Sequence, residues 1–418
     1  MIEILRSPDV ESPRAPGHSI LEETHMPSLS VPTRAQIAFS LVIGSIAVLI
    51  VGVQPILLGA LVDTHRITMD GVGLLAMSEI ITLGLGVLIG DFLPVQHFRS
   101  ITIGAAVLTA GFDVVTAISA TSAGLLGSRA LGGLSEGVLV WASTCVIVRS
   151  AAPERIAGTF MVLQTLGQAG VAALLASVVV LRAGWQGGFL VLAALSMLAA
   201  ALAFSQPVRL APLAKGGAER LTLSASAALT LTVIFLEQAA IGALWAYLEP
   251  LGQAVGLTAL TSQTVVSVVL CAQLAGGCLG TLLVKRLGPV LGLTASCAVL
   301  ACIPLGVRAL APGGALHFTL LAALFGFAWV FSFPFQIGLA FNADPAGRIA
   351  MLTPALQLLG SAFGPLVASM MVSDDNARPA TLASAAFGIL AMLLLLGCRR
   401  WFSRPVAERH DAEVVAPN

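Results

Sequence analysis

Long apolar runs recur through this chain, and their length limits what it can fold into. Twelve predominantly apolar segments of about 18 or more residues lie between Ala35 and Trp401, and a helix needs about 20 such residues to cross a hydrocarbon core of about 30 Å. A helix also satisfies its own backbone hydrogen bonds, as lipid requires. Only 10% of the residues are charged, whereas soluble domains are about a quarter charged. The sequence therefore predicts an all-α, multi-pass membrane protein and excludes a soluble enzyme or a nucleic-acid-binding protein.

Breaks at charged, glycine-rich and proline-rich stretches separate the twelve predicted spans. They lie near 36–61, 71–91, 100–120, 123–148, 157–181, 186–205, 222–247, 260–284, 289–310, 316–341, 349–372 and 381–402. Residues 1–34 and 403–418 are polar and are expected to form disordered cytoplasmic tails.

Basic residues are distributed unequally between the two sets of loops. With the N-terminus inside, the cytoplasmic segments carry 16 of the 21 basic residues. The opposite side carries 4 of them, namely Arg66, Arg182, Arg308 and Arg378. Because cytoplasmic loops are enriched in Lys and Arg, both termini are predicted to be cytoplasmic. The expected location is the cell membrane, specifically a bacterial inner membrane.

An internal repeat divides the chain into two halves. The stretch RIAGTFMVLQTLGQA from Arg155 matches RIAMLTPALQLLGSA from Arg348 at eight of fifteen positions, with an offset of 193 residues. The predicted organisation is a six-helix bundle over 35–205, a cytoplasmic linker over 206–221 and a second six-helix bundle over 222–402. Two parallel six-helix repeats are a transporter architecture with the substrate site between the repeats.

Several short patterns then resemble a known family. The fourth span contains LLGSRALGGLSEG, with Arg129 and Gly133 spaced as Arg-x-x-x-Gly, the turn into the sixth span reads GWQGGF from Gly184, and the eleventh contains Gly364-Pro365. Over residues 36–402 the chain resembles the major facilitator superfamily, and its drug–proton antiporter and sugar-efflux branch is the most similar. The resemblance implies the major facilitator fold, with 12 transmembrane helices in two six-helix pseudo-repeats, and alternating-access transport of a small organic solute.

The chain also departs from the family patterns. The connection GDFLPVQHFRS keeps Asp91 and Arg99 of the family's gating loop but lacks its second glycine and its paired cations. Gln186 stands where the family has Arg, and TLGQAGVAA lacks the proline of the antiporter helix. Proton coupling, and export in preference to uptake, are the expectations that the resemblance supplies.

Five acidic or basic residues lie well inside predicted spans, away from the span ends: Glu79, Asp113, Arg129, Glu136 and Glu237. Each costs about 2.5–3.5 kcal/mol at mid-bilayer on insertion scales and therefore needs a partner or a wet cavity. At about 1.5 Å per residue, Asp113 and Arg129 lie at similar depths on sequential antiparallel helices. A structural salt bridge is one interpretation of this pair, and a gating or proton-linked role for Arg129 is the other.

The remaining acids have two possible roles each. Glu136 follows Arg129 by seven residues and so returns to nearly the same helix face. The resemblance places Arg129, Glu136 and Glu237 on helices that line the transport cavity, where the two acids would handle substrate or protons. Glu79 is either a third such acid or a hydrogen-bonding group between helices.

Other side chains complete the set of candidates. Trp329 is central in its span and is expected to line the cavity, while Gln164 and Gln357, related by the repeat, would hydrogen-bond to substrate or to neighbouring helices. Trp245 and Tyr247 fit an aromatic belt at the outer interface. Gly86-x-x-x-Gly90, Gly133-x-x-x-Gly137 and Gly276-x-x-x-Gly280 predict close helix packing, and Pro55 and Pro334 predict kinks.

No cluster of His, Cys or acidic residues has metal-ligand spacing, and no nucleotide-binding loop occurs. We therefore expect no metal, no cofactor and no enzymatic activity. The expected partners are a small-molecule substrate, a proton and the lipid bilayer, without nucleic acid, and the expected state is a monomer. A multi-pass membrane enzyme and a non-transporting receptor on a transporter fold are the alternatives.

The predicted topology can be tested with reporter fusions. Fusions after Arg155, Lys215 and Arg404 should report the cytoplasm, and those after Arg66 and Arg378 the opposite side, because of the unequal distribution of basic residues. Paired alkaline phosphatase and green fluorescent protein activities measure this. A non-cytoplasmic signal at Lys215 would contradict both the orientation and the division into two bundles.

Overall fold

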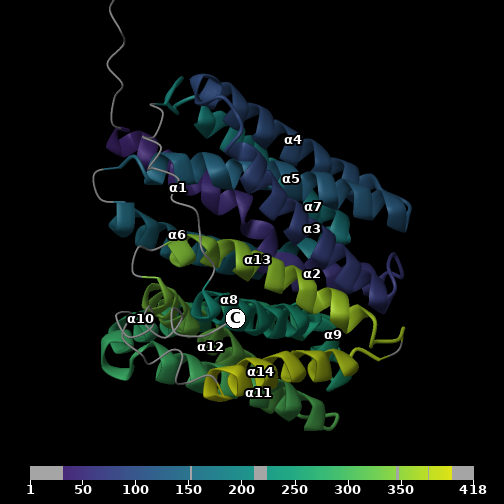
Figure 1. Ribbon diagram of the computed structural model, residues 1–418. Coiled ribbons are helices and arrows are strands. Elements are labelled where there is room, and N and C mark those ends of the chain that lie inside the picture. The colour runs from purple at the N-terminus through teal and green to yellow at the C-terminus, as the bar shows by residue number, and fades with distance from the viewer. Residues whose placement is uncertain (1–31, 151–152, 211–223, 345–347, 375, 398–418) are drawn as a thin grey trace, which may run out of the picture.

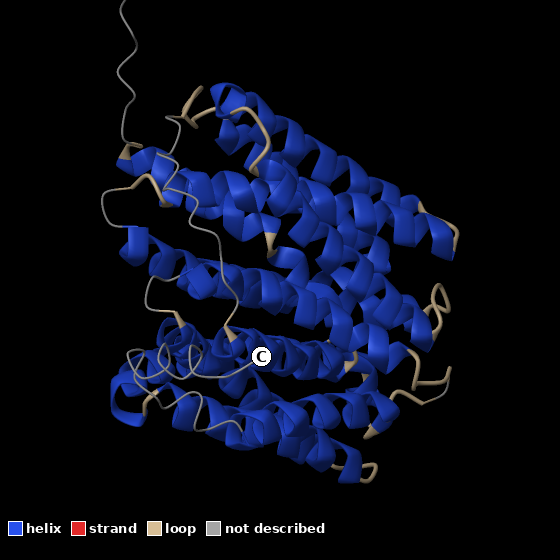
Figure 2. Cartoon of the chain, in the orientation of Figure 1, coloured by secondary structure: helices blue, strands red, loops and turns tan. Residues whose placement is uncertain are grey.

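The computed structural model describes residues 32–150, 153–210, 224–344, 348–374 and 376–397, and these are almost entirely helical (Figure 2). The predicted tails 1–34 and 403–418 fall almost wholly outside the described residues, as does the greater part of the predicted linker 206–221. The β-pairing within the described ranges is an isolated bridge between Ser373 and Asn376.

The helices follow one another with short connections. The elements of the first half are α1 (Arg34–Ala47), α2 (Leu49–Asp63), α3 (Met69–Gly90), η1 (Val95–His97), α4 (Phe98–Ile118), α5 (Ser122–Ile147), α6 (Pro153–Leu174), η2 (Leu175–Val179) and α7 (Val180–Ala203). Those of the second half are α8 (Ala225–Trp245), α9 (Leu248–Ala254), α10 (Ala259–Leu287), α11 (Pro289–Ala309), α12 (Ala315–Ala343), α13 (Arg348–Ser369) and α14 (Pro379–Gly397).

Eleven helical stretches among the described residues are long and apolar enough to cross a membrane. The longest, Arg155–Ala203, has 49 residues and combines the predicted fifth and sixth spans. Inside it, Gly184 has a φ of +64° and marks a kink between two merged helices, a conformation that glycine adopts without steric cost. Division at Gly184 gives the twelve predicted spans. The predicted fold class is confirmed.

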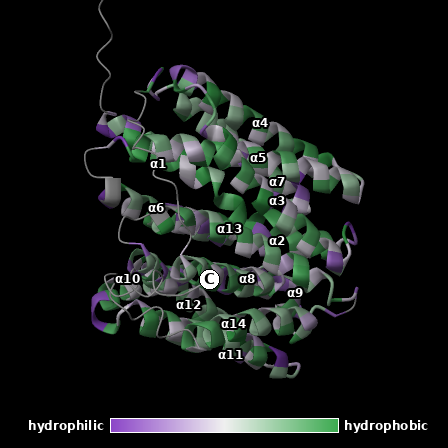
Figure 3. Cartoon of the chain, in the orientation of Figure 1, coloured by the Kyte–Doolittle hydropathy of each residue, from purple (hydrophilic) through white to green (hydrophobic). Residues whose placement is uncertain are grey.

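The two halves form two bundles that lie one above the other in Figure 1, α1–α7 mainly in the upper part and α8–α14 mainly in the lower, with α13 in the middle. The bundles meet where α3 packs against α13 and α6 packs against α10. Hydrophilic residues gather mainly at the two ends of the helices, and the helix middles are mostly hydrophobic (Figure 3). This distribution is that of a protein whose middle faces lipid.

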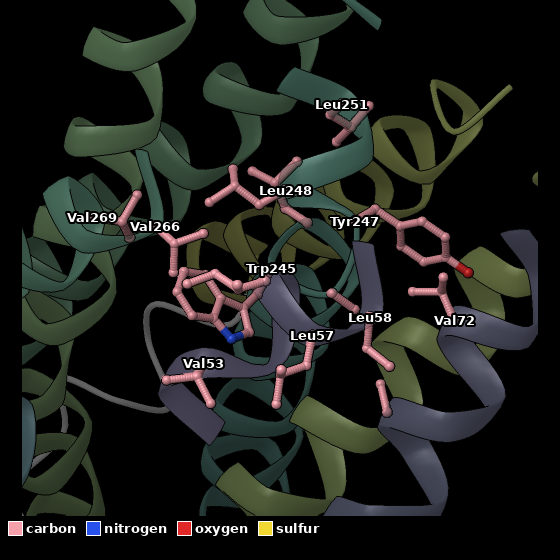
Figure 4. Close-up of a cluster of buried hydrophobic side chains, with 14 of the residues drawn as sticks. Val53, Leu57, Leu58, Val72, Trp245, Tyr247, Leu248, Leu251, Val266 and Val269 are labelled. Carbon is pink, nitrogen blue, oxygen red and sulfur yellow. The ribbon is translucent and has the colours of Figure 1, made fainter. Parts of the chain in front are cut away.

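The buried core differs between the two ends of the molecule. We call the end where α1 begins and α14 ends the tail end, and the end where α2 ends and α3 begins the far end. At the far end, one continuous apolar core combines residues of α2 and α3 with residues of α8, α9 and α10 (Figure 4). Toward the tail end, the apolar clusters each draw on one bundle alone, such as Ile43 with Ala199 and Leu293 with Phe335. The bundles are therefore sealed together at the far end.

A break in the first span and a proline beyond it create contacts to other helices. The helix is interrupted at Val48 (φ −103°, ψ 8°), whose carbonyl accepts a 2.7 Å hydrogen bond from Gln168 of α6. Pro55 lies inside α2 and lacks the N–H that would bond to the carbonyl of Val51. That carbonyl accepts instead from the indole of Trp245 in the other bundle, at 2.8 Å. Pro55 thus provides an acceptor for closure of the far end.

The predicted glycine pairs pack helices closely, as expected. A Cβ at Gly86 of α3 would overlap the carbonyl of Leu134 of α5, and one at Gly137 of α5 would overlap the carbonyl of Leu83. In the second bundle, Cβ atoms at Gly276 and Gly280 of α10 would overlap backbone carbonyls of α12. The absence of side chains lets these backbones approach each other.

Gly137→Leu tests this packing. We expect the free energy of unfolding to fall by about 1–3 kcal/mol or more, because the new side chain would force α3 and α5 apart. Gly104→Leu is the matched control, since Gly104 is exposed on α4 and nothing lies within 4 Å of a Cβ there. Thermal unfolding in detergent measures both, and equal melting temperatures for the two variants would contradict the packing.

Candidate functional site

Arg129 is enclosed by three carboxylates inside the first bundle. Its Nε donates to Oε1 of Glu79 at 2.6 Å, and its Nη2 donates to the same oxygen. Its Nη1 donates to Oδ1 of Asp113 at 2.6 Å, and its Nη2 also reaches Oε1 of Glu136 at 3.1 Å. The guanidinium lies over the ring of Phe189, 5.1 Å from the centroid. We call Arg129, Glu79, Asp113 and Glu136 the arginine cluster.

Helix geometry explains how these side chains meet. Glu79 lies at the middle of α3, and Arg129 and Glu136 lie two turns apart on one face of α5. Between them, a Cβ at Gly133 would overlap the carbonyl of Glu79, so this glycine lets α3 approach α5 at the depth of the cluster. The predicted pairing of Asp113 with Arg129 is confirmed, and Glu79 shares the same guanidinium.

The arginine cluster carries more negative than positive groups. If all three acids were ionised, the single guanidinium would leave a net charge of −2, and each side chain in the three ion pairs is at most 5% exposed. An uncompensated buried charge costs several kcal/mol, so the arrangement favours retention of at least one proton. Oε2 of Glu136 has no hydrogen-bond partner among the described residues. The cluster therefore has the composition of a proton-exchanging group, with more acids than its cation can neutralise.

A second polar chain crosses three helices of the other bundle. Oε2 of Glu237 on α8 accepts from Nε2 of Gln336 on α12 at 2.9 Å, and that nitrogen also lies 3.2 Å from Oγ of Ser332. Nε2 of Gln357 on α13 donates to Oε1 of Gln336 at 2.6 Å. Glu237 is fully buried, whereas Gln357 is partly exposed. The chain therefore joins a buried acid to a partly exposed amide.

The other predicted site residues lie apart from these two groups. Gln164 is partly exposed, and its amide contacts Sδ of Met161 at 3.2 Å. In the predicted gating loop, Asp91 accepts from the indole of Trp141 at 3.0 Å, and Arg99 donates to the carbonyl of Gln206 at 2.7 Å. Both loop residues thus hold helix ends of the first bundle.

The aromatic side chains require one correction. Trp245 and Tyr247 are 3% and 0% exposed and lie inside the shared far-end core (Figure 4), so the predicted interfacial belt is wrong for both. They turn inward because the first bundle covers them, Trp245 by its hydrogen bond to Val51. Trp329 is partly buried, with its ring 5.4 Å from that of Trp245 and 5.9 Å from that of Phe325.

Three buried polar residues, two of them in these groups and one outside both, were missed by sequence reasoning. Gln336 bridges Glu237 and Gln357, and Gln54 of α2 lies 3.5 Å from Oε2 of Glu79. The available signal was a polar side chain within an apolar span, close to Pro334 in one case and to Pro55 in the other. Glu249, just beyond α8, is the third.

Comparisons with known proteins agree with this architecture. The sequence profile of the Major Facilitator Superfamily matches residues 37–357. The chain belongs to the major facilitator superfamily. Comparison with curated protein sequences gives no match.

Solved structures of this superfamily have the same fold. A crystal structure of the nucleoside transporter NupG aligns with a TM-score of 0.67 at 14% identity, covering 89% of this chain and 100% of that one. The D-xylose–proton symporter aligns with a TM-score of 0.64 at 16% identity over 86% and 95% of the two chains. An inward-facing, occupied bacterial homologue of the lysosomal transporter Spinster gives a TM-score of 0.64 at 15% identity over 88% and 96%. These likenesses show the fold.

The ion pair between Arg129 and Asp113 can be tested with a double-mutant cycle. Arg129→Gln alone should lower the free energy of unfolding by about 3–5 kcal/mol, because it leaves buried acids without their cation. Asp113→Asn together with Arg129→Gln should cost less than the sum of the single changes, by at least about 0.5 kcal/mol.

Thermal and denaturant unfolding in detergent measure all four proteins of the cycle. The matched control pairs Arg129→Gln with Asp91→Asn, whose carboxylate bonds to Trp141 instead, and these two changes should be additive. Additivity for the Asp113 pair as well would show that the two groups do not interact.

Proposed function

We propose that this protein is a secondary active transporter that moves a small organic solute by alternating access, coupled to protons through the arginine cluster. The observation that carries the proposal is the burial of three acids around one guanidinium on α3, α4 and α5. A buried group that changes its protonation state during a transport cycle needs a stable neutral form. Burial and neighbouring carboxylates both disfavour the charged form of an acid, so the excess of acids in this apolar site stabilises a neutral one.

The position of the cluster supports coupling to movement. Glu79 belongs to α3, and α3 also packs against α13 of the second bundle. Protonation of Glu79 would weaken its attraction to Arg129 and loosen α3 against α5. A change in charge inside the first bundle would thereby shift α3 and alter its contact with α13 of the second bundle.

The polar chain of the second bundle supports a role in substrate recognition. Gln357 is partly exposed and presents an amide that donates to Gln336, and Gln336 in turn donates to Glu237. Trp329, partly buried on α12, supplies an aromatic face. Such a set favours a solute with polar hydrogen-bonding groups and an apolar or ring-shaped body.

The resemblance of Arg129-x-x-x-Gly133 to the antiporter branch supports export as the direction of transport. We propose a location in a bacterial inner membrane with both termini in the cytoplasm, which the distribution of basic residues supports. On that orientation the sealed far end faces outward. One chain contains both repeats, so a monomer is the proposed working unit.

Glu136→Gln tests proton coupling. Reconstituted wild-type protein is first screened with drugs, sugars, nucleosides and aromatic acids under imposed pH gradients of both signs, and the sign that drives flux gives the direction. The Gln variant keeps the size and hydrogen bonding of the acid but remains neutral, so it should still exchange substrate between two equal pools. Accumulation against a gradient should fall to a concentration ratio of about one.

Asp70→Asn is the matched control, because this exposed acid in the first turn of α3 lies outside the cluster and should leave the ratio of accumulation to exchange unchanged. The same measurements on Glu79→Gln and Asp113→Asn identify which acid carries the proton. If all three cluster variants retain full pH-driven accumulation, the arginine cluster is not the coupling site.

A further inference from the structure

The far end contains a buried acid that neither polar group uses. Glu249 lies in the first turn of α9, beyond the end of the membrane-spanning helix at Trp245, and is fully buried. Its Oε1 accepts a 2.7 Å hydrogen bond from Nε2 of Gln253. Its Oε2 is buried and has no hydrogen-bond partner in the part of the chain that the structure describes. A buried polar atom without a partner is costly and calls for an explanation.

Gln253 connects this acid to the other bundle. Its Nε2 also donates to both carboxylate oxygens of Asp63 at the end of α2, at 2.9 and 3.1 Å. A single amide nitrogen therefore holds one carboxyl of each bundle, and the bridge exists only while the bundles meet at the far end.

Glycine provides the space for the acid. On the face of α2 that meets α9, a Cβ at Gly59 would overlap the carboxyl of Glu249. The carboxyl thus fills the position of a missing side chain on the opposite bundle. Separation of the far end would withdraw it from α2 and expose it to water.

Its surroundings disfavour a negative charge. Burial raises the pKa of Glu249 to about 8, the hydrogen bond from Gln253 lowers it, and the negative charge of Asp63 raises it. Four further charged or titratable residues lie on or beside the neighbouring elements. Arg378 donates from Nη2 to the carbonyl of Ala254, and His317 lies in the first turn of α12. Lys285 and Arg286 lie at the opposite end of α10. None of these forms an ion pair with Glu249 within the described residues.

We propose that Glu249 is a second proton-binding group, which lets the two bundles close at the far end when it is protonated and favours their separation when it is ionised. The protonated acid can be enclosed against Gly59, and the carboxylate regains water when the far end opens. The proton enters and leaves from the far side, so it regulates closure and is not itself carried across. This role does not depend on the arginine cluster being the coupling site.

The sign of the pH dependence follows from linkage. The closed form has the raised pKa of about 8, against an ordinary value of 4.5, so it binds the proton more tightly than the open form. Closure is therefore favoured below about pH 5 and loses this contribution as the pH rises to about 8. One proton changes the ratio of open to closed molecules by at most about tenfold per pH unit.

The experiment measures the far-end separation directly and needs no substrate. Spin labels are attached at Thr64, exposed between α2 and α3, and at Ser373, exposed between α13 and α14, in a full-length protein whose native cysteines are replaced. Pulsed electron–electron double resonance in nanodiscs records the distance distribution from pH 5 to pH 9. A short distance should dominate at pH 5, and a longer one should grow in as the pH rises.

Two variants and a control identify the group. Glu249→Gln mimics the protonated acid and should keep the short distance at every pH. Gly59→Ala should favour the long distance even at pH 5, because its methyl group takes the place of the carboxyl. Asp70→Asn removes an exposed acid at the same end and should behave as the wild type.

Hydrogen exchange on the unlabelled wild-type chain supplies a second readout. After correction for intrinsic pH dependence, peptides covering α9 should gain protection at low pH relative to those of α14. The proposal is overturned if the wild-type distances do not change with pH, or if Glu249→Gln keeps the wild-type pH dependence. The two proposals fail separately. If the cluster variants keep pH-driven accumulation while the far-end distances still change with pH, the arginine cluster is not the coupling site and the role of Glu249 stands.

Discussion

The burial of one guanidinium among three carboxylates is the interaction on which the first bundle depends. Arg129 supplies donors to acids on α3, α4 and its own helix α5, and lipid offers no water to replace any of them. Hydrophobic burial cannot hold membrane helices together, since lipid tails are as apolar as leucine, and close packing must do so. The glycines at positions 86, 133 and 137 allow the backbone approach that brings Glu79 within reach of Arg129.

Two features of α2 that a regular helix would not offer join the second bundle to the first: a backbone carbonyl without an intrahelical partner, and a position without a side chain. Pro55 leaves the carbonyl of Val51 free for Trp245, and Gly59 leaves room for Glu249. Both features lie on α2, the half of the first span beyond its break at Val48. A contact made of a carbonyl that has no partner in its own helix and an empty side-chain position can be formed and released without unfolding either helix, as the proposed alternating access requires.

The sequence predicted those contacts of the site that follow from spacing along one helix or from two residues lying at the same depth in the membrane. Helical rise placed Asp113 beside Arg129, and a seven-residue spacing placed Glu136 below it. The partnership of Glu79 with Arg129 could not be predicted, because it depends on which face of α3 meets α5. Gln336 and Gln54 were missed for the same reason. Trp245 lies at the end of its helix but faces the other bundle instead of lipid, because position along a helix does not tell whether another bundle covers a side chain.

The helix α3 links the two places where protons are proposed to act. Its middle supplies Glu79 to the arginine cluster, and its far-end turn supplies Gly73, where a Cβ would overlap the carbonyl of Pro365 of α13 and approach the hydroxyl of Tyr247. Tyr247 lies two residues before Glu249. A shift of α3 against α5, caused by a change in the charge around Arg129, would therefore reach the far-end contact within three turns of one rigid helix. Coupling between the two sites then needs no chain of side chains, because the same helix packs against α5 at its middle and against the second bundle at its end.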